Sequence, residues 1–126
     1  MINEYLLYAA GALNIVVAVF HLLFWKLFHW KTELKKISSL NSAVMQVMNL
    51  RLIYLFLLTA FLCFFYTRDL VETRVGNAML IGFSFLWLGR LVEQFIFFKL
   101  NHWIGYAVTF LFIAGTVLFA LPVFMK

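Results

Sequence analysis

The chain has 126 residues, of which 66% are hydrophobic and only 12% are charged, and its formal net charge is +5. Soluble domains are about half apolar and about a quarter charged, and small domains bury only part of the surface they carry. The composition therefore excludes a soluble domain and indicates that lipid is the solvent. The single cysteine, Cys63, excludes an intramolecular disulfide and a thiolate metal cluster.

Four apolar runs are each long enough to cross the hydrocarbon core, which takes roughly 20 helical residues. They cover residues 5–25, 43–66, 76–98 and 103–124. The first run lacks the basic start of a signal peptide and is too long for one, so we expect it to be a span. We predict an all-α fold: an integral membrane four-helix bundle that forms a single transmembrane domain over residues 1–126.

The segment between the first and second spans is amphipathic, because its apolar residues recur at spacings of three and four while its charged residues mostly take the other face. The apolar set is Leu27, Trp30, Leu34 and Ile37, and the charged set is Lys26, Lys31, Glu33, Lys35 and Lys36. This pattern is typical of a short interfacial helix, here about 27–40, in the headgroup plane. The alternative is a cytoplasmic extension of the first span with snorkelling lysines.

Polar residues near the starts of the later spans are candidate N-caps, whose side chains accept a hydrogen bond from the first helical turn. In chain order these candidates are Asn41 or Ser42, then Thr73 or Asn77, and finally Asn101. They predict where the second, third and fourth spans begin.

The basic residues indicate an orientation, because short cytoplasmic loops carry an excess of lysine and arginine. The side of loops one and three carries Lys26, Lys31, Lys35, Lys36, Arg51, Arg90 and Lys99. The opposite side carries Arg68, Arg74 and Lys126. We therefore expect loops one and three in the cytoplasm and both termini outside. Anionic headgroups beside the helix ends also explain the net charge, so a nucleic-acid partner is not expected.

Polar side chains inside the spans are the candidate functional residues, because they are costly in lipid. The candidates for ligand binding or proton coupling are His21, Asn14, Asn49, Arg51, Arg90, Glu93 and Gln94. Glu93 needs a cation or a proton, and two cations are within reach: Arg90 on the same helix and Arg51 at a similar depth on the second span. One reading is a structural ion pair that pins the third span against the second. The other is a proton-coupling or ligand-binding carboxylate.

His21 has several possible roles inside a span. An imidazole there can ligate haem or a metal, shuttle protons, or hydrogen-bond a neighbouring helix. Haem ligation would pair it with His102, which lies toward the same membrane face. No HxxxH or HxxE pair shares a helix face, so a metal site is not predicted.

Small residues predict how the spans pack, because they let helices approach closely in lipid. Gly82 and Gly89 lie seven residues apart on the third span, and Gly105 begins a similar stripe on the fourth. Gly11 and Ala18 share a face of the first span. We expect spans one, three and four to pack through these faces.

The stretch HLLFWKLFHWKTELKKISSLN contains a His-x-x-Phe, a Trp-x-x-Glu-Leu and a Ser-x-x-Asn, and the third span contains FLWLGRLVEQFIFF. In these motifs the chain resembles a family of small four-span bacterial inner-membrane proteins of uncharacterised function. The resemblance implies a bacterial inner (plasma) membrane location and brings no activity with it. It also implies that one recurring constellation contains His21, Trp30, Glu33, Asn41, Arg90 and Gln94.

No hydrolase, zinc-protease, CxxC or nucleotide-loop motif is present. We predict a non-catalytic helical-bundle subunit or small-ligand binder, with the lipid bilayer and a homo-oligomer or other protein as partners. One alternative is an oligomeric channel or proton-coupled transporter that uses Glu93, Arg90 and His21. A second is a haem-, quinone- or lipid-binding protein, so the cofactor stays open. A membrane enzyme would need a pocket that joins Asn49 and Arg51 to Arg90 and Glu93.

Overall fold

The computed structural model describes residues 2–98 and 103–125, which are helical without strands. Four helices are long and apolar enough to cross a membrane: α1 (Ile2–Leu22), α4 (Ser39–Phe65), α6 (Arg74–Phe97) and α7 (Trp103–Phe124). The shorter elements are α2 (Phe24–Leu27), α3 (Trp30–Glu33), the 3-10 turn η1 (Leu34–Lys36) and α5 (Thr67–Glu72). The prediction of an all-α chain with four membrane-length helices is therefore confirmed.

The helix starts are set by side-chain caps. Helix α4 begins earlier than expected because Ser38 is its cap, and the Ser38 Oγ accepts from the Asn41 backbone N–H at 3.2 Å. The expectation of a cap at Asn41 or Ser42 is wrong. Thr73 caps α6 as predicted, since its Oγ1 accepts from the Gly76 N–H at 2.9 Å. The predicted cap Asn101 lies outside the described residues.

The segment between α1 and α4 differs from the single helix expected over about 27–40. The helix breaks at Leu23, and His29 takes a left-handed conformation with φ 53° that separates α2 from α3. The chain thereby turns back so that Trp30 and Leu34 are buried, while Leu27 and Ile37 stay exposed. The chain forms two short helical turns instead of one straight helix. The turn between them folds the segment back toward α4, which buries two of its four apolar residues, Trp30 and Leu34.

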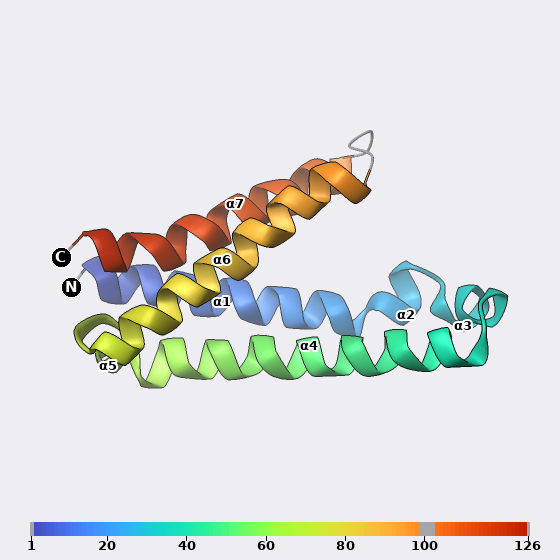
Figure 1. The fold of residues 1–126 in the computed structure, drawn as a ribbon, viewed down its shortest axis with the longest axis horizontal. Coiled ribbons are helices and arrows are strands. Elements are labelled where there is room, and N and C mark those ends of the chain that lie inside the picture. The colour runs from blue at the N-terminus through green and yellow to red at the C-terminus, as the bar shows by residue number, and fades with distance from the viewer. Residues whose placement is uncertain (1, 99–102, 126) are drawn as a thin grey trace.

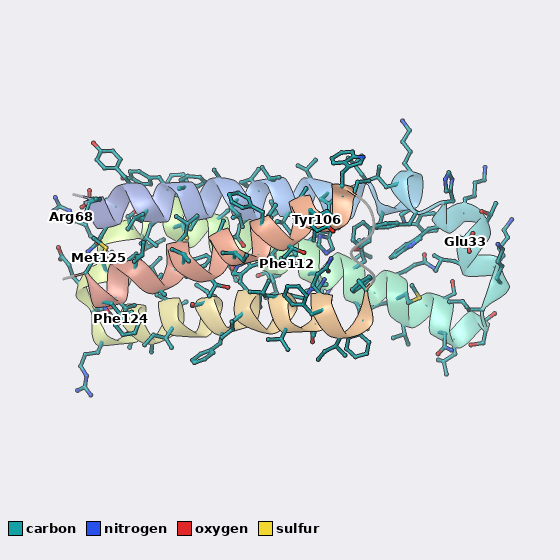
Figure 2. The ribbon with its side chains drawn as sticks, turned by 90° about the horizontal axis from the view of Figure 1, so that it is seen from above. Glu33, Arg68, Tyr106, Phe112, Phe124 and Met125 are labelled. Atoms are coloured by element: carbon teal, nitrogen blue, oxygen red, sulfur yellow. The ribbon has the colours of Figure 1, made fainter. Side chains whose placement is uncertain are left out.

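The four long helices form two hairpins, α1 with α4 and α6 with α7. Helix α1 also packs along α7, so the order across the bundle is α4, α1, α7, α6. Figure 1 shows the two hairpins diverging toward the end that carries α2 and α3, and the first hairpin extends beyond the second. The start of α1 and the end of α7 lie together at the opposite end, where Figure 2 also places Arg68 and Phe124.

One continuous core joins the helices. Its centre is Trp87, which is 2% exposed. The Trp87 ring stacks on Phe56 of α4, with ring centroids 5.7 Å apart, and lies 5.9 Å from Phe112 of α7. A Cβ on Gly115 would lie 2.7 Å from the Trp87 ring, so the glycine makes the space that α6 and α7 share. The stack of Phe56 on Trp87 connects α4 to α6.

The predicted packing through glycines is not what the structure shows. Gly11 packs against Phe64 of α4, the second span, which is not one of the three spans expected. Around Gly82 and Gly89 a Cβ would meet no described atom within 4 Å beyond the adjacent backbone of α6, so the expectation that this face packs within the bundle is wrong. The face of α6 that packs inward carries bulky residues instead, among them Leu80 and Trp87.

Candidate functional site

His21 lies near the end of α1 among aromatic rings. It is half-buried, and its Nδ1 lies 2.8 Å from the Val17 carbonyl oxygen, one helical turn earlier. A neutral ring that donates from Nδ1 keeps Nε2 as its acceptor. The ring stacks on Phe24 at 4.4 Å and contacts Phe56 at 5.1 Å, measured between centroids. Phe24 in turn touches Trp30 at 5.4 Å, so His21 and Trp30 belong to one aromatic cluster.

Asn49 ties α4 to the end of α1. Its Nδ2 donates to the His21 carbonyl oxygen at 3.1 Å, and the residue is 7% exposed. The Asn49 Oδ1 is buried without a hydrogen-bond partner in the described parts of the chain. The contact between α1 and α4 therefore uses the NH2 group of the Asn49 amide and leaves its oxygen without a described partner.

We expect Asn49→Leu to lower the free energy of unfolding by about 1 kcal/mol, the usual net value of one buried hydrogen bond. The loss is small because leucine also removes the unsatisfied Oδ1. The matched control is Gln46→Leu, since among the described residues Gln46 bonds to Ser42 within its own helix. Reversible unfolding in mixed detergent micelles would measure both variants, and equal losses would contradict the role of Asn49 between helices.

Asn14 is fully buried in the middle of α1. Its Nδ2 donates to the Ala10 carbonyl oxygen at 2.8 Å within the same helix. The residue also lines a cavity of about 60 Å³ between α4 and α6, beside Thr59 and Leu86. A volume of this size holds a water or two rather than a cofactor.

Arg90 and Glu93 form an ion pair within α6, with Arg90 Nη1 3.2 Å from Glu93 Oε1. The guanidinium also lies 4.7 Å above the ring of Phe112 and 5.8 Å from the ring of Phe98, which are cation–π distances. The Arg90 side chain is 37% exposed and the Glu93 side chain is 51% exposed. Arg90 is thus held against α7, while the carboxylate points outward.

Arg51 does not join this pair. It is exposed on α4, and no ion pair to it forms within residues 2–98 and 103–125. Glu93 therefore takes its cation from its own helix and does not pin α6 to α4 within the chain. No hydrogen bond or ion pair between described residues joins Asn49 or Arg51 to Arg90 or Glu93, the four residues that an enzyme pocket would require.

The remaining candidates lie apart. Gln94 is buried at the end of α6, and His102 falls outside the described residues. Glu33 pairs with Lys36 at 3.1 Å at the tip of the first hairpin, far from α6 in both views (Figures 1 and 2). No group of three His, Cys, Asp or Glu side chains in the described chain could hold a metal ion.

A feature missed by the sequence predictions lies at the opposite end of the bundle. Arg68 Nε approaches Glu4 Oε1 at 3.4 Å, which links the corner between α4 and α5 to the start of α1. A wide, shallow cavity of about 280 Å³ lies beside this pair and is lined by Tyr8 and Phe64. Opposite charges at the outer ends of adjacent spans were the available signal, but their pairing depends on which helices are neighbours.

Comparisons with protein-family models, with curated proteins and with solved structures give no match. The resemblance to small four-span bacterial proteins stays an expectation of the sequence motifs.

Proposed function

We propose that the protein is a four-span integral membrane protein that serves as a non-catalytic helical-bundle subunit. The observation that carries this proposal is the outward apolar surface of the long helices. Only 17% to 33% of the most apolar window of each long helix is buried inside the chain. Water would leave this apolar area unfavourably hydrated, whereas lipid or another membrane helix covers it without cost.

The helix lengths fit the bilayer. Helices α1 and α7 have 21 and 22 residues, which correspond to about 32 Å at about 1.5 Å per residue and match a hydrocarbon core of about 30 Å. Helix α4 has 27 residues and is longer. Its first turns extend past α6 and α7 together with α2 and α3 (Figure 1), where lysines reach the headgroups.

The same lysines support an orientation with loops one and three in the cytoplasm. Lys26, Lys31, Lys35 and Lys36 gather at the extended end, while the corner at α5 carries both signs of charge. In this arrangement both termini face outward. The resemblance of the motifs supports the plasma membrane of a bacterium.

A subunit role is favoured by the way the chain uses its polar groups. Within the helices, Asn14, His21 and Thr59 each bond to a carbonyl four residues earlier. Ser84 bonds across the second hairpin, from its Oγ to the Thr116 carbonyl oxygen at 2.9 Å. The first three groups are thus satisfied within their own helices, and Ser84 stabilises the contact between α6 and α7, as hydrogen bonds between helices commonly do in membrane proteins.

Membrane integration and orientation can be tested together with cysteine variants in a Cys63→Ala background. We expect the protein to stay in the membrane pellet after alkaline carbonate extraction. An impermeant maleimide should label Asp69→Cys in intact cells, and should label Lys35→Cys only after permeabilisation. Release by carbonate would contradict the four-span proposal, and labelling of both positions from outside would contradict the orientation.

The subunit role can be tested by native mass spectrometry of protein released from mild detergent. We expect peaks that contain only protein and exchangeable lipid. A stoichiometric small molecule that is retained at every detergent concentration would show a ligand binder instead. Its mass would then identify what the polar groups hold.

A further inference from the structure

The two helices at the ends of the row, α4 and α6, leave an opening between them on one side of the bundle. We define the α4–α6 opening by the residues that line the small cavity there: Leu55 and Thr59 on α4, and Phe83 and Leu86 on α6. The stacked rings of Phe56 and Trp87 close its floor. The hairpins diverge toward the end that carries α2 and α3 (Figure 1), which we call the lysine-bearing end because Lys26, Lys31, Lys35 and Lys36 lie there.

Two charged residues flank this opening. Arg51 lies four residues before Leu55 and therefore on the same face of α4. Glu93 lies seven residues after Leu86 and therefore on the same face of α6. Both side chains are exposed, so both point away from the core.

The stack of Phe56 on Trp87 also sets the relative depth of the two charges. The helices are antiparallel (Figure 1). Arg51 is five residues before Phe56, and Glu93 is six residues after Trp87, so both are displaced toward the lysine-bearing end by about 7.5 Å and about 9 Å respectively. The two charges therefore lie at nearly the same depth.

Both charges have unused bonding capacity. Arg51 has no ion pair within the described residues, and the Glu93 carboxylate gives only Oε1 to Arg90. Charges on the outer face of a span are costly unless they reach headgroups or an opposite charge. Arg51 and Glu93 of one chain form no ion pair with each other.

We propose that two copies of this chain associate in the membrane through their α4–α6 openings, with Arg51 of each copy paired to the partner's Glu93. A two-fold axis along the bilayer normal places α4 of one copy opposite α6 of the other, at unchanged depth. A single interface therefore contains two ion pairs, which pair Arg51 and Glu93 of both copies. This inference rests on the proposed four-span arrangement and names the partner of the subunit.

The surface of α6 fits the approach of another helix. Gly82 and Gly89 lie on the strip that contains Leu86 and Glu93, at spacings of three and four. A Cβ at either glycine would meet no described atom within 4 Å beyond the adjacent backbone of α6, so the surface is low and open at these two positions in the single chain. A second copy gives these glycines the close packing that they lack within one bundle. A different protein would have to supply both opposite charges at this depth, which the second copy already carries.

Disulfide trapping tests the pairing directly. In a Cys63→Ala background, chains with Arg51→Cys and chains with Glu93→Cys, carrying tags of different size, are co-expressed and oxidised in native membranes. We expect a mixed disulfide between the two tagged chains. The matched control replaces Arg51→Cys by Val16→Cys, since Val16 is 57% exposed on α1 away from the opening, and should give at least tenfold less product.

The double variant Arg51→Cys/Glu93→Cys separates pairing between chains from pairing within one chain. A disulfide within a single chain, with no mixed dimer, would overturn the proposal and show that the hairpins close on themselves. Equal trapping by Val16→Cys would also overturn it, because it would show random collision.

A charge exchange tests the cause of association. Dimerisation in liposomes is measured by energy transfer between labelled copies. Relative to the wild type, the association constant should fall at least tenfold for Arg51→Glu and for Glu93→Arg. The double exchange Arg51→Glu/Glu93→Arg should recover most of the loss. If the wild type is monomeric while carbonate still leaves it in the membrane, the dimer is wrong and the four-span proposal stands. Release of the protein by carbonate removes the basis of both.

Discussion

Replacing Trp87 by alanine is expected to lower the free energy of unfolding by about 3 kcal/mol, the low end of the range for a buried aromatic residue. Trp87 is 2% exposed and touches rings from two other helices, Phe56 and Phe112. Lipid already solvates apolar side chains well, so the loss comes mainly from the cavity and the missing contacts rather than from transfer out of water. Unfolding in mixed micelles, followed by far-ultraviolet circular dichroism, measures the change.

The control for this substitution is Trp25→Ala. Trp25 is 46% exposed on α2, and its ring lies edge-on to Trp30 with centroids 6.1 Å apart. We expect a loss below about 1 kcal/mol for this variant, as is usual for exposed positions. Similar losses for the two tryptophans would contradict the view that Trp87 holds the hairpins together.

Gly76→Ala is expected to destabilise the chain by about 3 kcal/mol, the upper part of the usual range for overpacking. Gly76 lies in the first turn of α6, where a Cβ would meet backbone atoms of Asp69 and Leu70 in α5. Backbone atoms cannot move aside as a rotamer can, so α5 must shift away from α6. The same unfolding measurement, together with loss of folded protein on size-exclusion chromatography, would show the effect.

Gly82→Ala is the matched control, because it makes the same chemical change on the same helix with no described atom beyond the adjacent backbone of α6 within 4 Å. Alanine favours a helix over glycine by about 0.5–1 kcal/mol, so in micelles that each hold a single copy this variant should be equal to the wild type or slightly more stable. A larger loss at Gly82 than at Gly76 would contradict the contact between α5 and α6.

Much of the fold could be predicted from the sequence, because the length and apolarity of a helix are local properties. The runs at 43–66 and 103–124 closely match α4 and α7. The Arg90–Glu93 ion pair could also be predicted, since a spacing of three places both side chains on one helix face. Thr73 was a correct cap for the same reason, as the cap and its N–H are three residues apart.

What could not be predicted depends on how the helices turn against one another. Asn49 bonds to His21, which lies 28 residues earlier in the chain. Nothing in the sequence of α1 or α4 fixes how these two helices are rotated against each other. The stripe of Gly82 and Gly89 pointed to a packed face, yet the bulky face with Trp87 is the one buried. The reversal at His29 required a left-handed residue that is not glycine, which sequence patterns rarely signal.

The position of α1 between α4 and α7 has a consequence for folding order. Its contact with α4 can form as soon as the first hairpin is complete, whereas its contact with α7 joins segments from the two ends of the chain. Contacts of such long sequence separation form late, because they wait for synthesis and for closure of a long loop. Although α1 is made before α4, α6 and α7, it completes its contacts only when α7 arrives, and until then one flank of α1 must be shielded by lipid or by the insertion machinery.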